Sequence, residues 1–414
     1  MRGDGRDQRP SDDGDCSEAR NSLAGDPFRD LGSWIVSLLM DVSSEMIHAL
    51  LPVYLVTALG TSMLTVGVIE GIAEATASIT KVFSGALSDR LGKRKFLAAL
   101  GYGMAAFTKP IFPLATTVGW LIAARFIDRV GKGVRGAPRD ALVADISPVH
   151  LRGASFGLRQ SLDTVGAFLG PLLAIILMWL TTDKFTVVFW IAVIPAFLSF
   201  ALILVAVREP ERLPGLRQVR MPLSASELRN LGTTYWWVAA VAAVFTLARF
   251  SEAFLVLRAQ SIGVPLMLVP IVLVIMNIAY AVSAYPVGAI SDHIDRITVL
   301  ILGLLLLLAA DLMLGFSTGI VGVGFGVILW GLHMGFTQGL LATLVTDAVP
   351  AELRGTAFGM FNLVTGVALL AASVIAGLLW DVAGPRGTFL AGAAFTAVTL
   401  AGLLPLRARL TSKK

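Results

Sequence analysis

The sequence predicts an all-α polytopic membrane protein with twelve transmembrane helices in two six-helix pseudo-repeats. Its 414 residues are 56% hydrophobic and only 15% charged, and the mean hydropathy is +0.79. Because a soluble domain carries roughly 25% charged residues, this composition excludes an ordinary cytosolic enzyme, a secreted disulfide scaffold and a disordered regulator. The apolar stretches are also longer than the roughly ten-residue alternating strands of a membrane β-barrel. Helices are the spanning elements that remain.

Twelve stretches of about twenty residues are apolar enough to cross a bilayer. They cover residues 31–59, 65–88, 96–115, 120–137, 154–180, 185–207, 236–257, 266–290, 298–316, 320–345, 355–380 and 387–406. The one long connection, residues 208–233, contains Pro210, Pro214 and Pro222 and is predicted to be a cytoplasmic linker. It separates an N-terminal half, residues 31–207, from a C-terminal half, residues 234–406.

Both ends of the chain are polar. Residues 1–30 are rich in Asp, Arg, Gly and Ser and are predicted to be a disordered tail, and residues 407–414 are a short basic tail. The single cysteine, Cys16, lies in the first tail, so neither a disulfide nor a thiolate metal site is expected within one chain. No motif indicates a cofactor or a metal, and none is expected.

Lys and Arg set the predicted orientation, because basic loops stay on the cytoplasmic side of a membrane. The loops after the second and fourth spans and the C-terminus are basic, whereas the alternate loops contain only Lys184, Arg258 and Arg386. Both termini are therefore expected in the cytoplasm, in a multi-pass protein of a bacterial-type inner membrane. This placement also accounts for the net charge of +5, so a nucleic-acid partner is not expected.

The sequence repeats itself once. The segment GALSDRLGKR, from Gly85 to Arg94, recurs as GAISDHIDR, from Gly288 to Arg296, and ALVADISPVHLRGASFG at 141–157 recurs as TLVTDAVPAELRGTAFG at 343–359. Two independent matches at nearly the same offset indicate a duplicated unit. The predicted arrangement is two six-helix halves of like topology that face each other across a central path.

The first of these repeated segments resembles the loop signature of the major facilitator superfamily. The matching residues are Gly85, Asp89, Arg90, Gly92 and Arg94, and their counterparts in the second half are Gly288, Asp292 and Arg296. The resemblance implies a transporter that alternates access by rocking two halves, with this loop holding one gate closed. A plain basic loop that only sets orientation is the alternative.

The fifth span carries a second resemblance. Gly157, Gly166, Gly170 and Pro171 follow the spacing of the antiporter motif of the same superfamily, although Ala174 replaces its last glycine. Glycines at this spacing let another helix pack closely, and a proline bends the span. The resemblance implies an exporter that exchanges its substrate for protons. Ordinary packing of small residues is the alternative.

The fourth span is unusually charged. Leu121, Arg125 and Gly131 fit the fourth-helix pattern of the superfamily, but Asp128 and Arg129 stand where that pattern has glutamine and glycine. This departure weakens the analogy with multidrug transporters. Charged residues at three- and four-residue spacing share a helical face, and such a face must line a polar cavity or meet paired acids.

Ionisable residues on several other spans are the predicted partners. At about 1.5 Å per residue, Glu45, Glu74, Arg129 and Asp163 fall near the middle of a membrane core about 30 Å thick. A cluster at this depth is where a transporter holds its substrate or a coupling ion. The candidates for this cavity are Asp41, Glu45, His48, Glu70, Glu74, Arg125, Asp128, Arg129, Arg159, Asp163, Arg249, Glu252 and His333.

The leading hypothesis is that Glu45 or Asp41 takes a proton on one side and releases it on the other, while Arg125 or Arg129 competes for the carboxylate. A permanent network of ion pairs is the alternative. Acids one helical turn apart, as in Asp41 and Glu45, favour one protonated partner, which supports coupling. In the second half, Arg249 and Glu252 either satisfy each other or face the cavity, and His333 fits a core role better than a ligand role.

We expect a monomeric secondary transporter of a small solute in the lipid bilayer, with proton-coupled export as the first choice. A proton-coupled importer of a small organic anion or metabolite is the alternative. A membrane enzyme would need a nucleophile with a base or a set of metal ligands, and neither pattern is present. A receptor would have no need of midplane charges on four helices. The bases of the first half permit an anionic or zwitterionic solute but do not require one.

Overall fold

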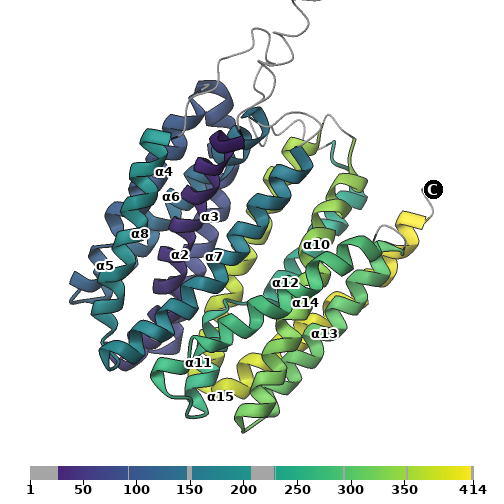
Figure 1. Cartoon of the computed structure of the whole chain (residues 1–414). Helices are drawn as coiled ribbons and strands as arrows, with labels where there is room; N and C mark the ends of the chain where they lie inside the picture. Colours follow the sequence, from purple (N-terminus) through teal and green to yellow (C-terminus); the bar gives the residue numbers. More distant parts are fainter. Residues whose placement is uncertain are drawn as a thin grey trace, which may run out of the picture.

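The computed structural model is a bundle of long helices (Figure 1) and describes residues 27–91, 93–146, 152–206, 228, 230–291, 294–350 and 353–411. Before the predicted linker the helices are α2 Pro27–Thr57, α3 Met63–Leu91, α4 Arg94–Thr108, α5 Ile111–Leu114, α6 Val118–Ile146, α7 Arg152–Thr181 and α8 Phe185–Ala206. After it come α10 Gly232–Ala248, α11 Ala253–Ser261, the 3-10 turn η2 Leu266–Leu268, α12 Ile271–Ser291, α13 Arg296–Phe316, α14 Ile320–Ala348 and α15 Arg354–Thr411.

The predicted all-α membrane fold is confirmed. In the ranges given above, nine helices are long and apolar enough to cross a membrane by length and composition. Each of the twelve predicted spans falls on a helix, but α4 has only 15 residues and α6 carries several charges, so these two are not among the nine. One of the nine, Thr356–Leu403, runs through a kink in α15 and covers two predicted spans. The count of twelve stays a prediction.

The ends of the predicted segments differ from the structure in three places. The helix α2 begins at Pro27, inside the predicted N-terminal tail, and proline is well suited to a first helical turn. The helix α10 begins at Gly232, inside the predicted linker, and α15 continues to Thr411, inside the predicted C-terminal tail. Residues 1–26 and 412–414 lie outside the described residues, as does most of the predicted linker.

Two of the predicted spans are interrupted. The third ends as α4 at Thr108, and Pro110, which has no backbone N–H to continue the helical ladder, separates it from α5. The seventh breaks between α10 and α11, where Arg249 leaves the helix with φ −106° and ψ 67°. Interrupted spans leave backbone groups free of the helical ladder and occur where the backbone is buried in protein or lines a cavity.

The kink in α15 lies at Gly384, which has φ 70° and ψ −176°. This left-handed φ suits glycine because it has no Cβ to clash, and Pro385 follows directly. The chain therefore turns here without a separate loop, and α15 consists of two helical arms that meet at Gly384.

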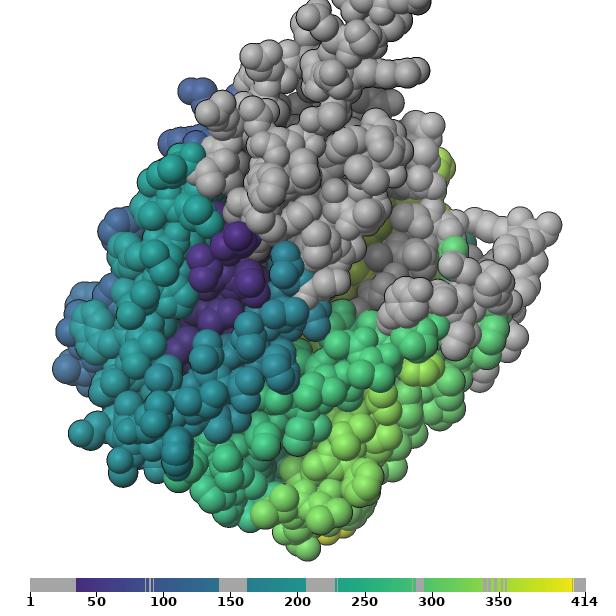
Figure 2. All heavy atoms as spheres, viewed as in Figure 1, coloured from purple at the N-terminus to yellow at the C-terminus, as the bar shows by residue number. Residues whose placement is uncertain are grey.

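The helices α4, α6 and α8 gather on one side of the bundle and α10, α13 and α14 on the other (Figure 1). On the face in Figure 2, α2 reaches the surface between α7 and α8, and it packs against both. Large apolar side chains such as Phe107, Trp179 and Ile194 are exposed on the outside, where lipid replaces water.

The first and last parts of the chain meet along α3 and α15. Here Gly67 lies against the carbonyl of Ser373, and Gly377 lies against the carbonyl of Met63, so the two backbones touch. We call the end of the bundle at Met63 the distal end, and the end that carries Lys93, Arg94 and Lys95 the basic end.

Candidate functional site

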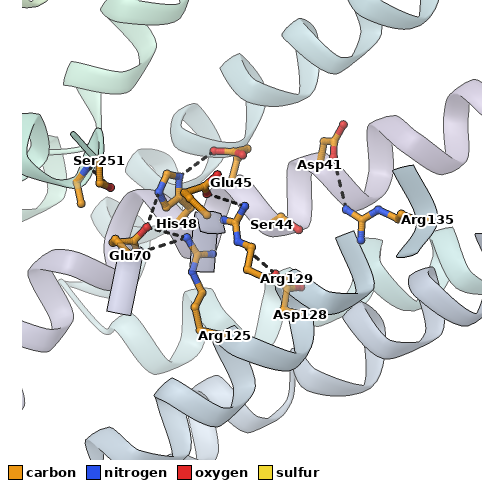
Figure 3. A network of polar contacts seen from close by, with 12 residues as sticks. Asp41, Ser44, Glu45, His48, Glu70, Arg125, Asp128, Arg129, Arg135 and Ser251 are labelled. Carbon is orange, nitrogen blue, oxygen red and sulfur yellow. Dashed lines mark hydrogen bonds and ion pairs between the residues drawn. The ribbon is translucent and has the colours of Figure 1, made fainter. Parts of the chain in front are cut away.

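A chain of ionic contacts links three helices in the interior of the first half. His48 Nδ1 lies 3.3 Å from Glu45 Oε2 on α2, and His48 Nε2 lies 3.4 Å from Glu70 Oε2 on α3. Arg125, from α6, places its Nη2 3.1 Å from the same Glu70 oxygen. Figure 3 shows these four side chains pointing toward one another. We call them the central network.

Access to solvent changes along the central network. The side chain of Glu45 is 23% exposed, that of His48 is 12% exposed, and that of Glu70 is fully buried. Glu45 is therefore the group of the network that solvent reaches, and Glu70 is sealed behind it.

The next turn of α6 repeats the arrangement. Arg129 Nη1 lies 3.0 Å from Glu74 Oε1, one turn along α3 from Glu70. The guanidinium of Arg129 is buried, whereas the side chain of Glu74 is 31% exposed. In this structure Arg125 and Arg129 pair with Glu70 and Glu74, and Glu45 faces His48. Competition of either arginine for Glu45 during transport stays a hypothesis.

A separate ion pair lies at the interruption of the third span. Lys109, between α4 and α5, donates from Nζ to Asp128 Oδ1 at 2.9 Å and to Ser44 Oγ at 3.0 Å. Both members of the Lys109–Asp128 pair are buried. Asp128 was expected to line the cavity, and the structure gives it a lysine partner that the sequence did not identify.

Toward the basic end, the charges continue between α2, α6 and α7. Asp41 Oδ1 lies 4.0 Å from Arg135 Nη2, and the Arg135 guanidinium stacks 4.9 Å from the ring centroid of Tyr102. Asp163 lies 3.7 Å from Arg139 and accepts a hydrogen bond from Ser37 Oγ at 3.0 Å. Polar contacts therefore extend from the middle of the bundle to its basic end.

The glycines of the fifth span face the acids of the first. A methyl group on Gly166 would stand 2.9 Å from Asp41 Cβ, and one on Gly170 would stand 2.5 Å from Glu45 Cβ. Pro171 lies inside the same helix, and Gly157 lies near its start. The glycine pattern thus lets α7 pack directly against the turns of α2 that carry Asp41 and Glu45.

The second half meets the central network at the interruption between α10 and α11. Glu252 lies within electrostatic reach of His48 and Glu45, and α11 packs against α2. Figure 3 shows Ser251 on the Glu70 and His48 side of the network. The hydroxyl of Ser251 accepts a hydrogen bond from the N–H of Ala253, the first residue of α11, at 3.2 Å.

The other candidates of the second half are placed as follows. Arg249 and Glu252 flank the interruption but have no ion pair within 4.0 Å in the part of the chain that the structure describes. His333 is fully buried, and its ring packs 5.4 Å from Trp330 with no hydrogen-bond partner among the described residues. The two halves also meet where Asn277 Nδ2 donates to the Ala167 carbonyl at 3.1 Å.

The loop candidates are only partly described. Gly85 lies in α3, where a methyl group would stand 3.4 Å from Ala137 Cβ on α6. Arg94 begins α4, Arg296 begins α13 and Gly288 lies in α12. Gly92 and Asp292 lie outside the described residues, as do the side chains of Asp89, Arg90 and Arg159. Over the described ranges, no group of three or more His, Cys, Asp and Glu is arranged to hold a metal ion.

Comparison with known proteins agrees with this architecture. Residues 33–373 match the family model of the Major Facilitator Superfamily. The MFS-type transporter MJ1317 of Methanocaldococcus jannaschii is 33% identical over 389 residues, which is 89% of this chain and 92% of that protein.

Solved structures share the fold at low identity. A POT family transporter in complex with a thioalcohol conjugated peptide superposes with a TM-score of 0.78 at 12% identity, over 94% of this chain and 98% of that one. The nucleoside transporter NupG gives a TM-score of 0.75 at 13% identity, over 91% of this chain and 99% of that one. The family model and the relative of 33% identity show that the chain belongs to the major facilitator superfamily, and it is an integral membrane transporter of that family.

Proposed function

We propose that the protein exports a small solute in exchange for protons by alternating access, with its basic end and both termini in the cytoplasm of a bacterial-type cell. The observation that carries the proposal is the bridge of His48 between Glu45 and Glu70, with Arg125 behind Glu70. A permanent ion pair with only a structural role would need one acid and one base. This network instead links a carboxylate that reaches solvent to one that is sealed.

The contacts suggest how a proton would act. Protonation of Glu45 removes the negative charge that faces His48 Nδ1, while His48 keeps its contact with Glu70. Because α2 also packs against α11, a change in the pairing of Glu45 alters an interface between the two halves. Differential pairing in two states is what couples an ion to a conformational change.

The packing of the glycines of α7 supports export as the direction of transport. The glycines that resemble the antiporter motif pack against Asp41 and Glu45 themselves. Movement of α7 and protonation of these acids are therefore physically linked. An importer that moves solute and proton together could use the same network, and the sign of the proton flux separates the two.

The experiment is proton movement in proteoliposomes that contain an internal pH dye, screened with organic cations, organic anions, sugar phosphates and divalent metals. We expect one solute class to drive a pH change, with solute and protons moving in opposite directions. Glu45→Gln should abolish the pH change. The control is Asp183→Asn, which changes an acid in a loop with φ 61° and should retain the pH change. Parallel movement would make the protein an importer, and solute flux without proton flux would reject coupling.

A further inference from the structure

The second half buries one acid deep inside an apolar helix. Asp311 is the only ionisable residue of α13 after Arg296, which begins that helix. It lies five residues before the helix ends, so about 8 Å inside the end of the span. Its side chain is fully buried and belongs to the same buried stripe as Leu304, Leu307 and Leu314. Asp311 therefore faces other helices and not lipid.

Neither oxygen of this carboxyl group receives a hydrogen bond. Oδ1 and Oδ2 of Asp311 are both buried and have no partner in the part of the chain that the structure describes. Gly392, on the second arm of α15, lies directly against them, because a methyl group there would stand 2.8 Å from Oδ2 and 3.1 Å from Oδ1. The hydroxyl of Thr396, one turn further along α15, donates to the Gly392 carbonyl of its own helix at 2.9 Å.

The charged groups around α13 are engaged elsewhere. Arg258 reaches the end of α13 from α11 and donates from Nε to the Leu314 carbonyl at 2.9 Å, and Arg386 stacks 4.5 Å from the ring centroid of Phe316. The helices α12, α14 and α15 pack against α13, and the titratable side chains that the structure describes on them are Tyr280, His333, Asp381 and Arg386. None of these side chains, nor Arg258, makes a hydrogen bond or an ion pair with Asp311.

The first half shows what a buried charged carboxylate requires. Glu70 is also fully buried, but Arg125 and His48 both lie within 3.4 Å of its carboxylate. An ionised carboxylate only accepts hydrogen bonds, whereas a protonated one carries no charge and can also donate. An unpaired negative charge at the depth of Asp311 would be very costly. The packing around Asp311 therefore suits a neutral carboxylic acid.

We propose that Asp311 is a second proton-binding site, which keeps one proton while α13 and α15 touch at Gly392 and releases it when the two helices separate. The site lies wholly within the second half, and its proton is sealed, whereas solvent reaches Glu45. An ionised Asp311 could not stay against Gly392 without a donor. The proton therefore acts as a latch between α13 and α15, and alkaline conditions weaken it.

The direct test is infrared absorption of the purified full-length protein in detergent at pH 8. Exposed Asp and Glu side chains are ionised at this pH, and a neutral carboxyl group absorbs at a higher frequency than an ionised one. We expect a neutral-carboxyl band in the wild type that is lost in Asp311→Asn. The matched control is Asp295→Asn, at an exposed acid that precedes the same helix, and it should keep the band. The same band in wild type and Asp311→Asn would overturn the proposal.

Exchange of the proton tests the latch. Transfer of the protein into D2O shifts the band only when the site opens. Gly392→Ala places a methyl group against the carboxyl oxygens and should speed this shift about tenfold or more, as overpacking of a core predicts. Gly324→Ala, with nothing within 4 Å of the added atom, should exchange as slowly as the wild type. An unchanged rate in Gly392→Ala would reject the latch.

Thermal unfolding gives an independent measurement. In the unfolded wild-type chain Asp311 is ionised above about pH 4, so folding must take up a proton, and the asparagine variant has no such requirement. The difference in unfolding temperature should therefore shift in favour of Asp311→Asn from pH 5 to pH 8, as the relative folding constant changes about tenfold per pH unit. A difference that is independent of pH would overturn the proposal. These measurements need no solute, so their outcome and that of the transport assay are separate.

Discussion

A methyl group on Gly170 would stand 2.5 Å from Cβ of Glu45, well inside any normal contact. The backbone of α7 thus lies directly on the turn of α2 that carries the solvent-reachable acid of the central network. The glycine face of α7 is therefore in contact with the acid that we propose as the proton carrier.

We expect Gly170→Ala to push α7 away from the turn of α2 that carries Glu45 and Met46. Overpacking of this kind costs about 1–3 kcal/mol, so both the unfolding temperature and solute flux should fall. Gly166→Ala should be milder, because its methyl would stand 2.9 Å from Asp41 Cβ. Gly324→Ala is the control, because nothing lies within 4 Å of the added atom. Equal behaviour of all three variants in unfolding and flux assays would contradict the close packing.

The Glu70–Arg125 pair is buried on both sides. Arg125→Met should therefore lower stability by about 3–5 kcal/mol, because a buried carboxylate is left with less compensation. Adding Glu70→Gln should recover a substantial part of this loss, since the unpaired charge is removed with its partner. Thermal unfolding of the two single variants and the double variant measures the coupling. Arg386→Met, two residues after the kink of α15 at an arginine that stacks 4.5 Å from Phe316, is the control and should cost little. Additive losses would show that the two side chains act independently.

Asp381 joins the halves at the distal end. Its Oδ1 accepts a hydrogen bond from the Met63 N–H at 3.0 Å and its Oδ2 one from the Leu64 N–H at 2.9 Å, at the start of α3. A carboxylate at a helix N-terminus is stabilised by the helix dipole as well. We expect Asp381→Ala to favour opening of the distal end, and Asp381→Asn to lie between it and wild type.

Spin labels on Ser62 and Val382, in a background with Cys16→Ser, measure this opening. Val382 is 77% exposed and tolerates a label. The distribution of distances between the labels should shift to longer values in Asp381→Ala. An unchanged distribution would mean that glycine packing along α3 and α15 holds this end closed without Asp381.

The Lys109–Asp128 pair should prove structural. It fills the interruption of the third span and is buried on both sides. Asp128→Asn should lower the unfolding temperature, while the number of protons moved per solute stays at the wild-type value. A changed stoichiometry in proteoliposomes would instead place Asp128 on the proton path.

Much of this architecture could be predicted from the sequence, because its causes are local. Long apolar runs specify spans, and the spacing of Arg125 and Arg129, or of Glu70 and Glu74, places each pair on one helical face. The depth of Glu45 follows from counting residues along its helix. None of these inferences requires knowledge of which helices touch.

Which charged side chains pair between helices could not be predicted, because it depends on how each helix is rotated about its axis. Sequence spacing could not show that both Arg125 and His48 meet Glu70, because these contacts join different helices. The interruption at Arg249 was also missed, since residues 249–252 contain neither proline nor glycine. The role of Asp381 could not be predicted from the sequence, because it caps a helix that begins more than three hundred residues earlier in the chain.

The central claim is that Glu45 carries the coupling proton, and comparing two modes of transport in Glu45→Gln tests it most directly. Solute exchange between equal pools needs no net proton movement, whereas accumulation against a solute gradient does. The account predicts that Glu45→Gln keeps exchange and loses proton-driven accumulation, while Asp183→Asn keeps both. Full proton-driven accumulation in Glu45→Gln would contradict it and move the coupling to another acid of the network.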